Sequence, residues 1–127
     1  MPATLDHTIV PATDKAASAA FLAHVLGIEG ARAWGPFVVL PVGNGTTLDF
    51  VDAASPPEHH YAFLVDEDEF DAMFARVRAS GAAYYADPFR RQPGEVNHHY
   101  GGRGVYFDDP DGHLMEILTQ PYDVPGL

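Results

Sequence analysis

The feature that most constrains this chain is an internal repeat of a strand, a helix and several short strands. The segment 7–27 reads as a strand followed by a helix that ends at a glycine, and the segment 60–81 repeats this order at almost the same length. In each half, the last strand candidate carries one acid among apolar neighbours, Asp49 in the first half and Glu116 in the second. Similarity at a fixed spacing indicates one structural unit used twice. The sequence therefore predicts an α+β fold of two tandem βαβββ modules that form an open, cleft-bearing mixed β-sheet.

Hydrophobic periodicity, together with Gly and Pro punctuation, sets the expected boundaries. Strands are expected near 5–10, 31–34, 37–42, 46–51, 60–65, 83–86, 104–107 and 114–119, with helices beginning after Thr13 or Asp14 and after Asp66. Pro11 is expected to end the first strand. We expect a single domain over 1–127, with module 1 at about 4–52, module 2 at about 59–120 and an inserted loop at about 87–103.

Composition excludes several classes of function. The chain has 18 acidic and 7 basic residues, for a formal charge of -11, so its surface repels phosphate backbones and nucleic-acid binding is not expected. No apolar run is long enough to cross a membrane. Cysteine is absent, which excludes disulfides and thiolate metal sites. These features are typical of a cytoplasmic protein, and a cytoplasmic location is our expectation.

Four polar residues stand at matched places in apolar strands: His7 with His60, and Asp49 with Glu116. Imidazole and carboxylate groups in apolar strands are costly unless they are paired, and together they suit a divalent metal. The repeat could bring them together on the floor of a cleft. The alternative is that each is a satisfied core residue, with Glu116 paired to Arg103.

The sequence resembles the vicinal oxygen chelate superfamily, which includes glyoxalase I, extradiol dioxygenases, and the fosfomycin- and bleomycin-resistance proteins. The resemblance rests on four segments: Leu5-Asp6-His7, the end of the first helix at 25–28, His60-Tyr61-Ala62-Phe63, and the DPDGH turn at 109–113 followed by Glu116. It covers about 4–119.

The resemblance implies a function and a ligand set. Metal-dependent members use a His in the first strand, a His in the fifth and a Glu in the last, which here are His7, His60 and Glu116. The metal would be a divalent Zn, Ni, Co, Mn or Fe ion that grips adjacent oxygens of a small metabolite. Asp49 stands where glyoxalase I carries a further acid ligand, so it is a candidate fourth ligand or acid–base group. Members usually form homodimers.

The resemblance leaves the reaction open. We interpret the chain as an enzyme, of glyoxalase-like lyase or isomerase type or of dioxygenase-like type. The alternative is a protein of the bleomycin-resistance type that sequesters a small molecule without catalysis. Fosfomycin transfer is not expected, because those relatives place a Thr two residues after the first His, where this chain has Ile9.

The expected pocket wall combines residues of the last module. Tyr106 is assigned to substrate binding and catalysis because fosfomycin-resistance relatives present a Tyr there. Arg103, His98 and His99 are assigned to substrate binding because the inserted loop, a candidate lid, concentrates cations and imidazoles in an acidic protein. Two further residues are interpreted structurally: Trp34 as a core residue, with the mouth of the cleft as the alternative, and His113 as turn surface.

Overall fold

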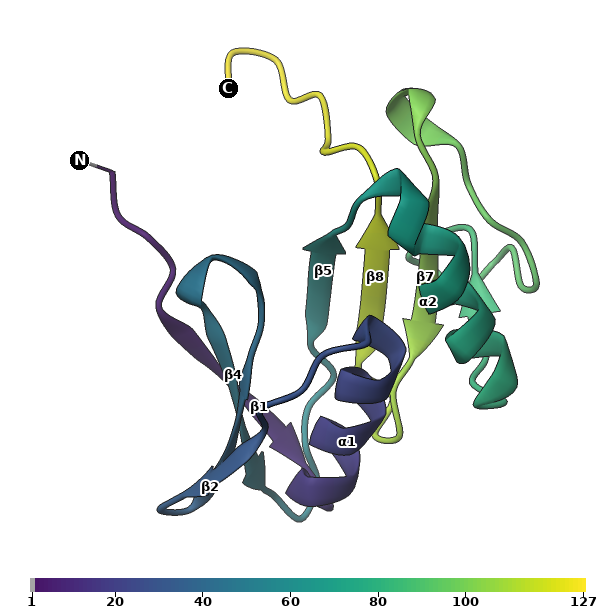
Figure 1. Ribbon diagram of the computed structural model, residues 1–127. Helices are drawn as coiled ribbons and strands as arrows, with labels where there is room; N and C mark the ends of the chain where they lie inside the picture. Colours follow the sequence, from purple (N-terminus) through teal and green to yellow (C-terminus); the bar gives the residue numbers. More distant parts are fainter. Residues whose placement is uncertain (1) are drawn as a thin grey trace. The chain divides into compact units, whose positions relative to one another are not determined.

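The computed structural model of the protein describes residues 2–127, which fall into two compact units, 2–58 and 59–127 (Figure 1). Each unit holds one four-stranded mixed sheet and one long helix. The prediction of two tandem βαβββ modules is confirmed. No helix within residues 2–127 has the length and apolar character needed to span a bilayer.

The elements of the first unit are β1 (His7–Ala12), α1 (Lys15–Leu26), β2 (Arg32–Trp34), β3 (Phe37–Pro41), a 3₁₀ turn (Gly43–Gly45) and β4 (Thr47–Asp52). The strands lie in the order β1-β4-β3-β2, with β1 parallel to β4 and the other pairs antiparallel. The turn between β3 and β4 matches the hairpin that the Gly-Asn-Gly sequence predicts, and Asn44 adopts a left-handed φ of 61° in it.

Helix α1 begins and ends as its sequence predicts. The carboxylate of Asp14 accepts a hydrogen bond from the backbone N–H of Ala17 at 3.1 Å, which caps the first turn. Gly27 ends the helix with a left-handed φ of 68° and donates its N–H to the carbonyls of the last turn. The helix contacts β1, β3 and β4. It therefore covers one face of the first sheet and leaves the other face without a helix of its own unit.

The strand register assigns side chains to these two faces, because directly paired residues lie on the same side of a sheet. The covered face carries the fully buried Val10, Leu40 and Phe50. The opposite face, called here the open face of the first unit, is a continuous set across all four strands: His7, Ile9, Pro11, Thr47, Asp49, Val51, Phe37, Val39, Pro41, Arg32 and Trp34.

The elements of the second unit are β5 (His60–Leu64), α2 (Glu67–Ala79), β6 (Tyr84–Tyr85), a 3₁₀ turn (His99–Gly101), β7 (Gly104–Asp108) and β8 (Leu114–Leu118). The order β5-β8-β7-β6 repeats that of the first unit, again with the first strand parallel to the last. Residues of α2 pack on the face that carries Phe107, Met115 and Ile117: Phe74 meets Tyr84 edge-on, with ring centroids 5.1 Å apart. The opposite face, the open face of the second unit, carries His60, Glu116 and Tyr106.

Two sequence-based interpretations are wrong. Pro11 does not end β1, which continues to Ala12 with Pro11 opposite Val51. Because β1 is an edge strand, the missing N–H of proline costs no ladder bond there. Trp34 is not a core residue, since it is 70% exposed. It lies on the open face, on the three-residue edge strand β2.

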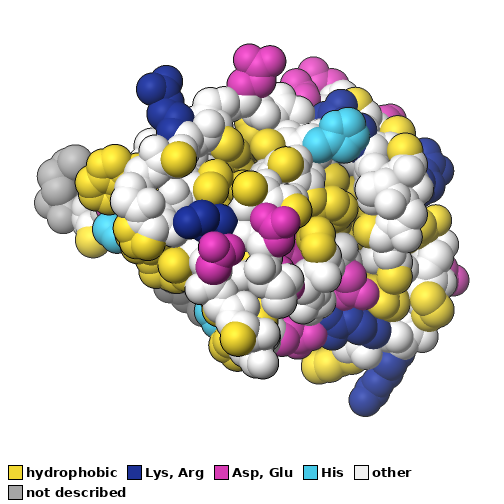
Figure 2. Space-filling view, turned by 90° about the horizontal axis from the view of Figure 1, so that it is seen from below, with side chains coloured by type: hydrophobic (Ala, Val, Ile, Leu, Met, Phe, Trp, Pro, Cys, Tyr) yellow, Lys and Arg dark blue, Asp and Glu magenta, His cyan; other side chains and the backbone are white. Residues whose placement is uncertain are grey.

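The charge distribution agrees with the expectation from composition. On the face of the molecule that Figure 2 presents, basic side chains (dark blue) lie singly, and several lie beside acidic ones (magenta). Among the ion pairs of the first unit, the ammonium of Lys15 lies 3.8 Å from the carboxylate of Asp52. That face therefore offers no basic patch for a nucleic acid.

Candidate functional site

The register repeats the placement of a histidine and an acid in both units. His7 begins β1, and the residue two positions later, Ile9, pairs with Asp49 of β4. His60 begins β5, and the residue two positions later, Ala62, pairs with Glu116 of β8. Each acid thus lies diagonally next to the histidine of its own unit, on the open face.

In the second unit the histidine and the acid touch. Nε2 of His60 lies 3.2 Å from Oε1 of Glu116, and the carboxylate is 2% exposed. Nδ1 of His60 lies 2.8 Å from the carbonyl oxygen of Leu114. A carbonyl only accepts hydrogen bonds, so Nδ1 carries a proton, and Nε2 is the ring nitrogen that faces the carboxylate. A proton on Nε2 or a metal ion between the two atoms would each satisfy this contact.

This donor set fits a divalent metal. Nitrogen and oxygen ligands about 2.0–2.2 Å from one ion lie roughly 3 Å from each other, as these two atoms do. A metal-binding histidine commonly donates its other ring N–H to a backbone carbonyl, which fixes the tautomer, and Leu114 supplies that carbonyl. The geometry of His60 and Glu116 is therefore compatible with two ligands of one metal ion.

Two tyrosines extend this pair. The hydroxyl of Tyr122, in the segment after β8, donates to the Glu116 carboxylate at 3.1 Å from Oε1 and 3.2 Å from Oε2, and it lies 3.0 Å from the hydroxyl of Tyr106. The Tyr106 ring lies against that of His60 at 5.9 Å. Burial, then the bond to Tyr122 and the charge of Glu116, raise the pKa of the Tyr106 hydroxyl. Tyr106 is thus a neutral donor at physiological pH and not an anionic base.

The sequence analysis missed Tyr122. Tyr122 lies three residues after the last predicted strand, and nothing in the periodicity indicated that its side chain reaches back to that strand. Its ring also lies 5.8 Å from that of Tyr100 in the inserted loop. Tyr122 therefore links Glu116, Tyr106 and the loop.

In the first unit the histidine and the acid have separate partners. Nδ1 of His7 lies 2.6 Å from the carboxylate of Asp6, and this bond chiefly raises the pKa of His7, with a smaller effect from the charge of Asp49. Asp49 is buried, and its Oδ1 accepts the hydroxyl of Thr47 at 2.8 Å. Within residues 2–127, neither unit by itself gathers three His or acidic side chains that could hold a metal ion.

Arg103 contacts acidic and aromatic side chains of helix α2 in the second unit. Its guanidinium lies 2.7 Å from the carboxylate of Glu67 and 2.6 Å from that of Asp71, both on α2, and stacks 4.5 Å above the ring of Phe70. The alternative that Arg103 pairs with Glu116 is therefore wrong, because the guanidinium is held on the covered side of β7. Its assignment to substrate binding stays without structural support.

Most of the inserted loop is fixed to the sheet. Arg90 donates to the carboxylate of Asp108 at 2.8 Å, and the carboxylate of Asp87 accepts backbone N–H groups from the next turn of the loop. Asn97 exchanges two backbone hydrogen bonds with Gly104. The loop as a lid stays a prediction, and residues 98–102 are the part of it without these contacts to the sheet. The exposed His98 and His99 lie there, beside the Tyr100 that contacts Tyr122.

His113 is buried, so its interpretation as turn surface is wrong. Its side chain is fully enclosed, and its Nδ1 accepts the backbone N–H of His59 at 2.9 Å. The DPDGH turn folds back on the start of β5, so this residue is enclosed although it directly follows a turn. His59 in turn contacts the hydroxyl of Tyr61 at 2.8 Å, and burial, with a contribution from the charge of Asp109, raises the pKa of Tyr61 to about 12.

Comparison with known proteins agrees with this geometry. The family model that describes the Glyoxalase/Bleomycin resistance protein/Dioxygenase superfamily matches residues 4–117 of this sequence. Among solved structures, the oxidase ChaP-H2 is 53% identical, with a TM-score of 0.94 over 99% of this chain and 100% of that one.

Two curated relatives are more distant. The metallothiol transferase FosB of Shouchella clausii (strain KSM-K16) is 38% identical over 60 residues, which are 47% of this chain and 37% of that protein. The glutathione transferase FosA of Serratia marcescens is 27% identical over 121 residues, which are 90% of this chain and 79% of that protein. The match to FosB thus spans only about a third of that protein's length.

Proposed function

Because the chain belongs to the glyoxalase/bleomycin resistance protein/dioxygenase superfamily, we propose that it is a metal-dependent oxidase that acts on a small oxygenated organic molecule. The observation that carries the proposal is the His60–Glu116 pair, a buried carboxylate facing Nε2 of an imidazole in a chain that is 53% identical to an oxidase over nearly its whole length. The ion would supply Lewis-acid and redox chemistry when it is bound.

The proposal gives the candidate residues distinct roles. His60 and Glu116 are ligands, His7 is the third ligand, and the protein is a homodimer. Asp49 is a fourth ligand or moves protons. Tyr106, a neutral hydroxyl beside His60, contacts a bound oxygen of the substrate. His98 and His99 are substrate contacts from the loop. The metal is a divalent Zn, Ni, Co, Mn or Fe ion, and the reconstitution experiment below identifies which of them it is. A cytoplasmic location stays an expectation.

A sequestering protein of the bleomycin-resistance type is the second candidate. The paired His60 and Glu116 speak against it, because an apolar pocket that only holds a ligand gains nothing from a buried carboxylate aimed at an imidazole. Lyase or isomerase chemistry uses the same ligands, so it differs from the proposal only in the need for dioxygen.

Metal removal tests the proposal. Protein purified without a His tag is stripped with a chelator and reconstituted separately with Mn, Fe, Co, Ni or Zn, and bound metal is counted per chain. Each preparation is then supplied with small molecules that carry adjacent oxygens, and oxygen uptake and product formation are followed. We expect about one ion per chain, and oxygen uptake that is lost on stripping and restored by one redox-active ion.

The control is His60→Ala, which removes one ligand from the open face. If wild type and His60→Ala bind equally little metal from the full set of ions, the metal-dependent proposal fails. Metal-dependent turnover without oxygen uptake would instead assign lyase or isomerase chemistry.

Tyr122→Phe isolates the hydroxyl that holds Glu116. We expect divalent-metal affinity to fall about 10-fold, because partners that orient ligands contribute on that scale, while stability changes by less than about 1 kcal/mol. The measurement is a cobalt titration followed by absorbance, with thermal unfolding in parallel. Tyr100→Phe is the matched control on the neighbouring ring, and equal cobalt affinity in Tyr122→Phe and wild type would contradict the prediction.

A further inference from the structure

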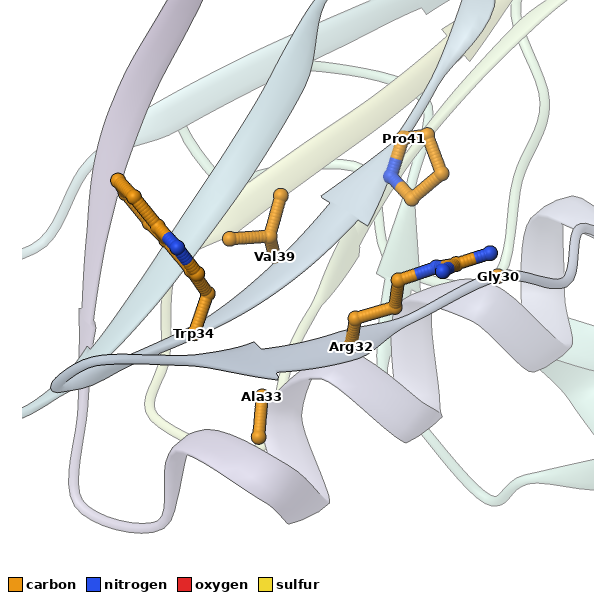
Figure 3. A pocket seen from close by; sticks show the side chains of 6 residues that line it. All are labelled: Gly30, Arg32, Ala33, Trp34, Val39 and Pro41. Atoms are coloured by element: carbon orange, nitrogen blue, oxygen red, sulfur yellow. The ribbon is translucent and has the colours of Figure 1, made fainter.

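The first unit carries a pocket to which no function has been assigned so far. It has a volume of about 380 Å³ and is lined by Gly30, Arg32, Ala33, Trp34, Val39 and Pro41 (Figure 3). This volume lies in the range of small-molecule sites. In the figure, Arg32 and Trp34 project to one side of β2, with Val39 and Pro41 of β3 beside them, whereas Ala33 points to the opposite side.

The pocket lies on the open face of the first unit, which it shares with His7 and Asp49. Arg32 pairs with Val39, and Val39 pairs with Asp49, so these three side chains lie in one row across β2, β3 and β4. Strands lie about 4.8 Å apart, so Arg32 and Asp49 are separated by roughly 10 Å, with an apolar residue between them. Val39 therefore separates Arg32, in the pocket wall, from the carboxylate of Asp49 on the next strand.

The walls of the pocket differ in chemistry. The indole of Trp34 is 70% exposed, although a large aromatic ring gains free energy from burial. Val39 and Pro41 supply an apolar floor. At the other end, Arg32 is the one basic side chain for which the residues 2–127 show no acidic or aromatic partner, in a chain with 18 acids.

From an exposed indole, an apolar floor and an unpaired guanidinium on one face, we infer that this pocket binds a planar aromatic molecule carrying an acidic group. The ring stacks on Trp34 and covers Val39 and Pro41, and the anion pairs with Arg32, whose planar fork suits a carboxylate. The inference rests on the proposed function in one respect only, that the ligand is the substrate of the oxidase. It names the substrate class as aromatic acids or acidic phenols.

The chain offers a direct probe, because Trp34 is its only tryptophan. Metal-free protein is titrated with 2-naphthoate and, separately, with the uncharged 2-naphthamide, by calorimetry and by tryptophan emission excited at the red edge. We expect 2-naphthoate to bind at least about 10-fold more tightly than the amide, a factor that corresponds to about 1.4 kcal/mol, and to change the Trp34 emission.

Arg32→Gln is expected to remove this preference and to leave the affinity for the amide unchanged. Arg91→Gln is the matched control, because Arg91 also lies beside an aromatic ring, that of Phe89, but in the second unit. Trp34→Leu, followed by calorimetry, is expected to weaken the binding of both probes.

Two results would overturn the inference: equal binding of the two probes to wild type, or a preference for naphthoate that survives Arg32→Gln. The titration uses protein without metal, so its outcome is separate from that of the proposed oxidase. Binding of naphthoate by a protein that takes up no metal would leave the pocket assigned and the oxidase rejected.

Discussion

Glu116→Gln is expected to abolish most divalent-metal affinity while the second unit keeps its fold. The substitution preserves the shape of the side chain and its ability to accept the hydroxyl of Tyr122, but it removes the negative charge that faces Nε2 of His60. Changing the partners of a ligand alone costs about 10–100-fold in affinity, so loss of the anionic ligand should exceed about 100-fold.

The free energy of unfolding of metal-free Glu116→Gln should increase or stay unchanged. The carboxylate is 2% exposed, and a buried charge without its metal is a cost to the folded state. We therefore expect the free energy of unfolding of metal-free Glu116→Gln to equal or exceed that of metal-free wild type. Metal affinity by cobalt titration and unfolding by urea measure the two quantities separately.

Glu95→Gln is the matched control for Glu116→Gln, because it removes one negative charge from an exposed position of the same unit. It should change neither quantity beyond measurement error. If Glu116→Gln binds cobalt as wild type does, Glu116 is not a ligand. A large loss of stability in metal-free Glu116→Gln would instead indicate that the carboxylate serves the fold.

The repeat made the order of elements in this fold predictable, and it singled out four candidate residues, His7, His60, Asp49 and Glu116. The histidines lie in the first strand of each module and the acids in the last strand, and the structure adds the register that relates them. His60 and Glu116 meet because both lie in regular strands, where alternation determines the face.

The residues that were misjudged lie where alternation does not apply. Trp34 sits on a three-residue edge strand, and the sequence of so short a strand does not reveal which face lacks a helix. Tyr122 follows the last strand, and its contact with Glu116 depends on how the tail folds back. Arg103 was available to several acids, and tertiary packing beside α2 selected Glu67 and Asp71.

His113→Ala is expected to cost about 2–4 kcal/mol of stability, which would make it among the most damaging substitutions outside the apolar core. The imidazole is fully enclosed, so its removal leaves a cavity, and its Nδ1 accepts the backbone N–H of His59, which would lose its partner. Leu114 donates its own N–H to the carbonyl of His59 at 2.9 Å, so consecutive residues of the turn and β8 hold His59 from both of its backbone groups.

These two hydrogen bonds to the backbone of His59 also help to position the candidate site, because the next residue is His60. We expect His113→Ala to lower metal affinity as well as stability, whereas His113→Asn, whose side-chain oxygen can accept the same N–H, should recover part of both. His98→Ala, at an exposed loop position, should stay within about 0.5 kcal/mol of wild type. Urea unfolding measures the stability of the three variants, and cobalt titration measures their metal affinity. A His113→Ala protein as stable as His98→Ala would show that the turn, and not the imidazole, positions the start of β5.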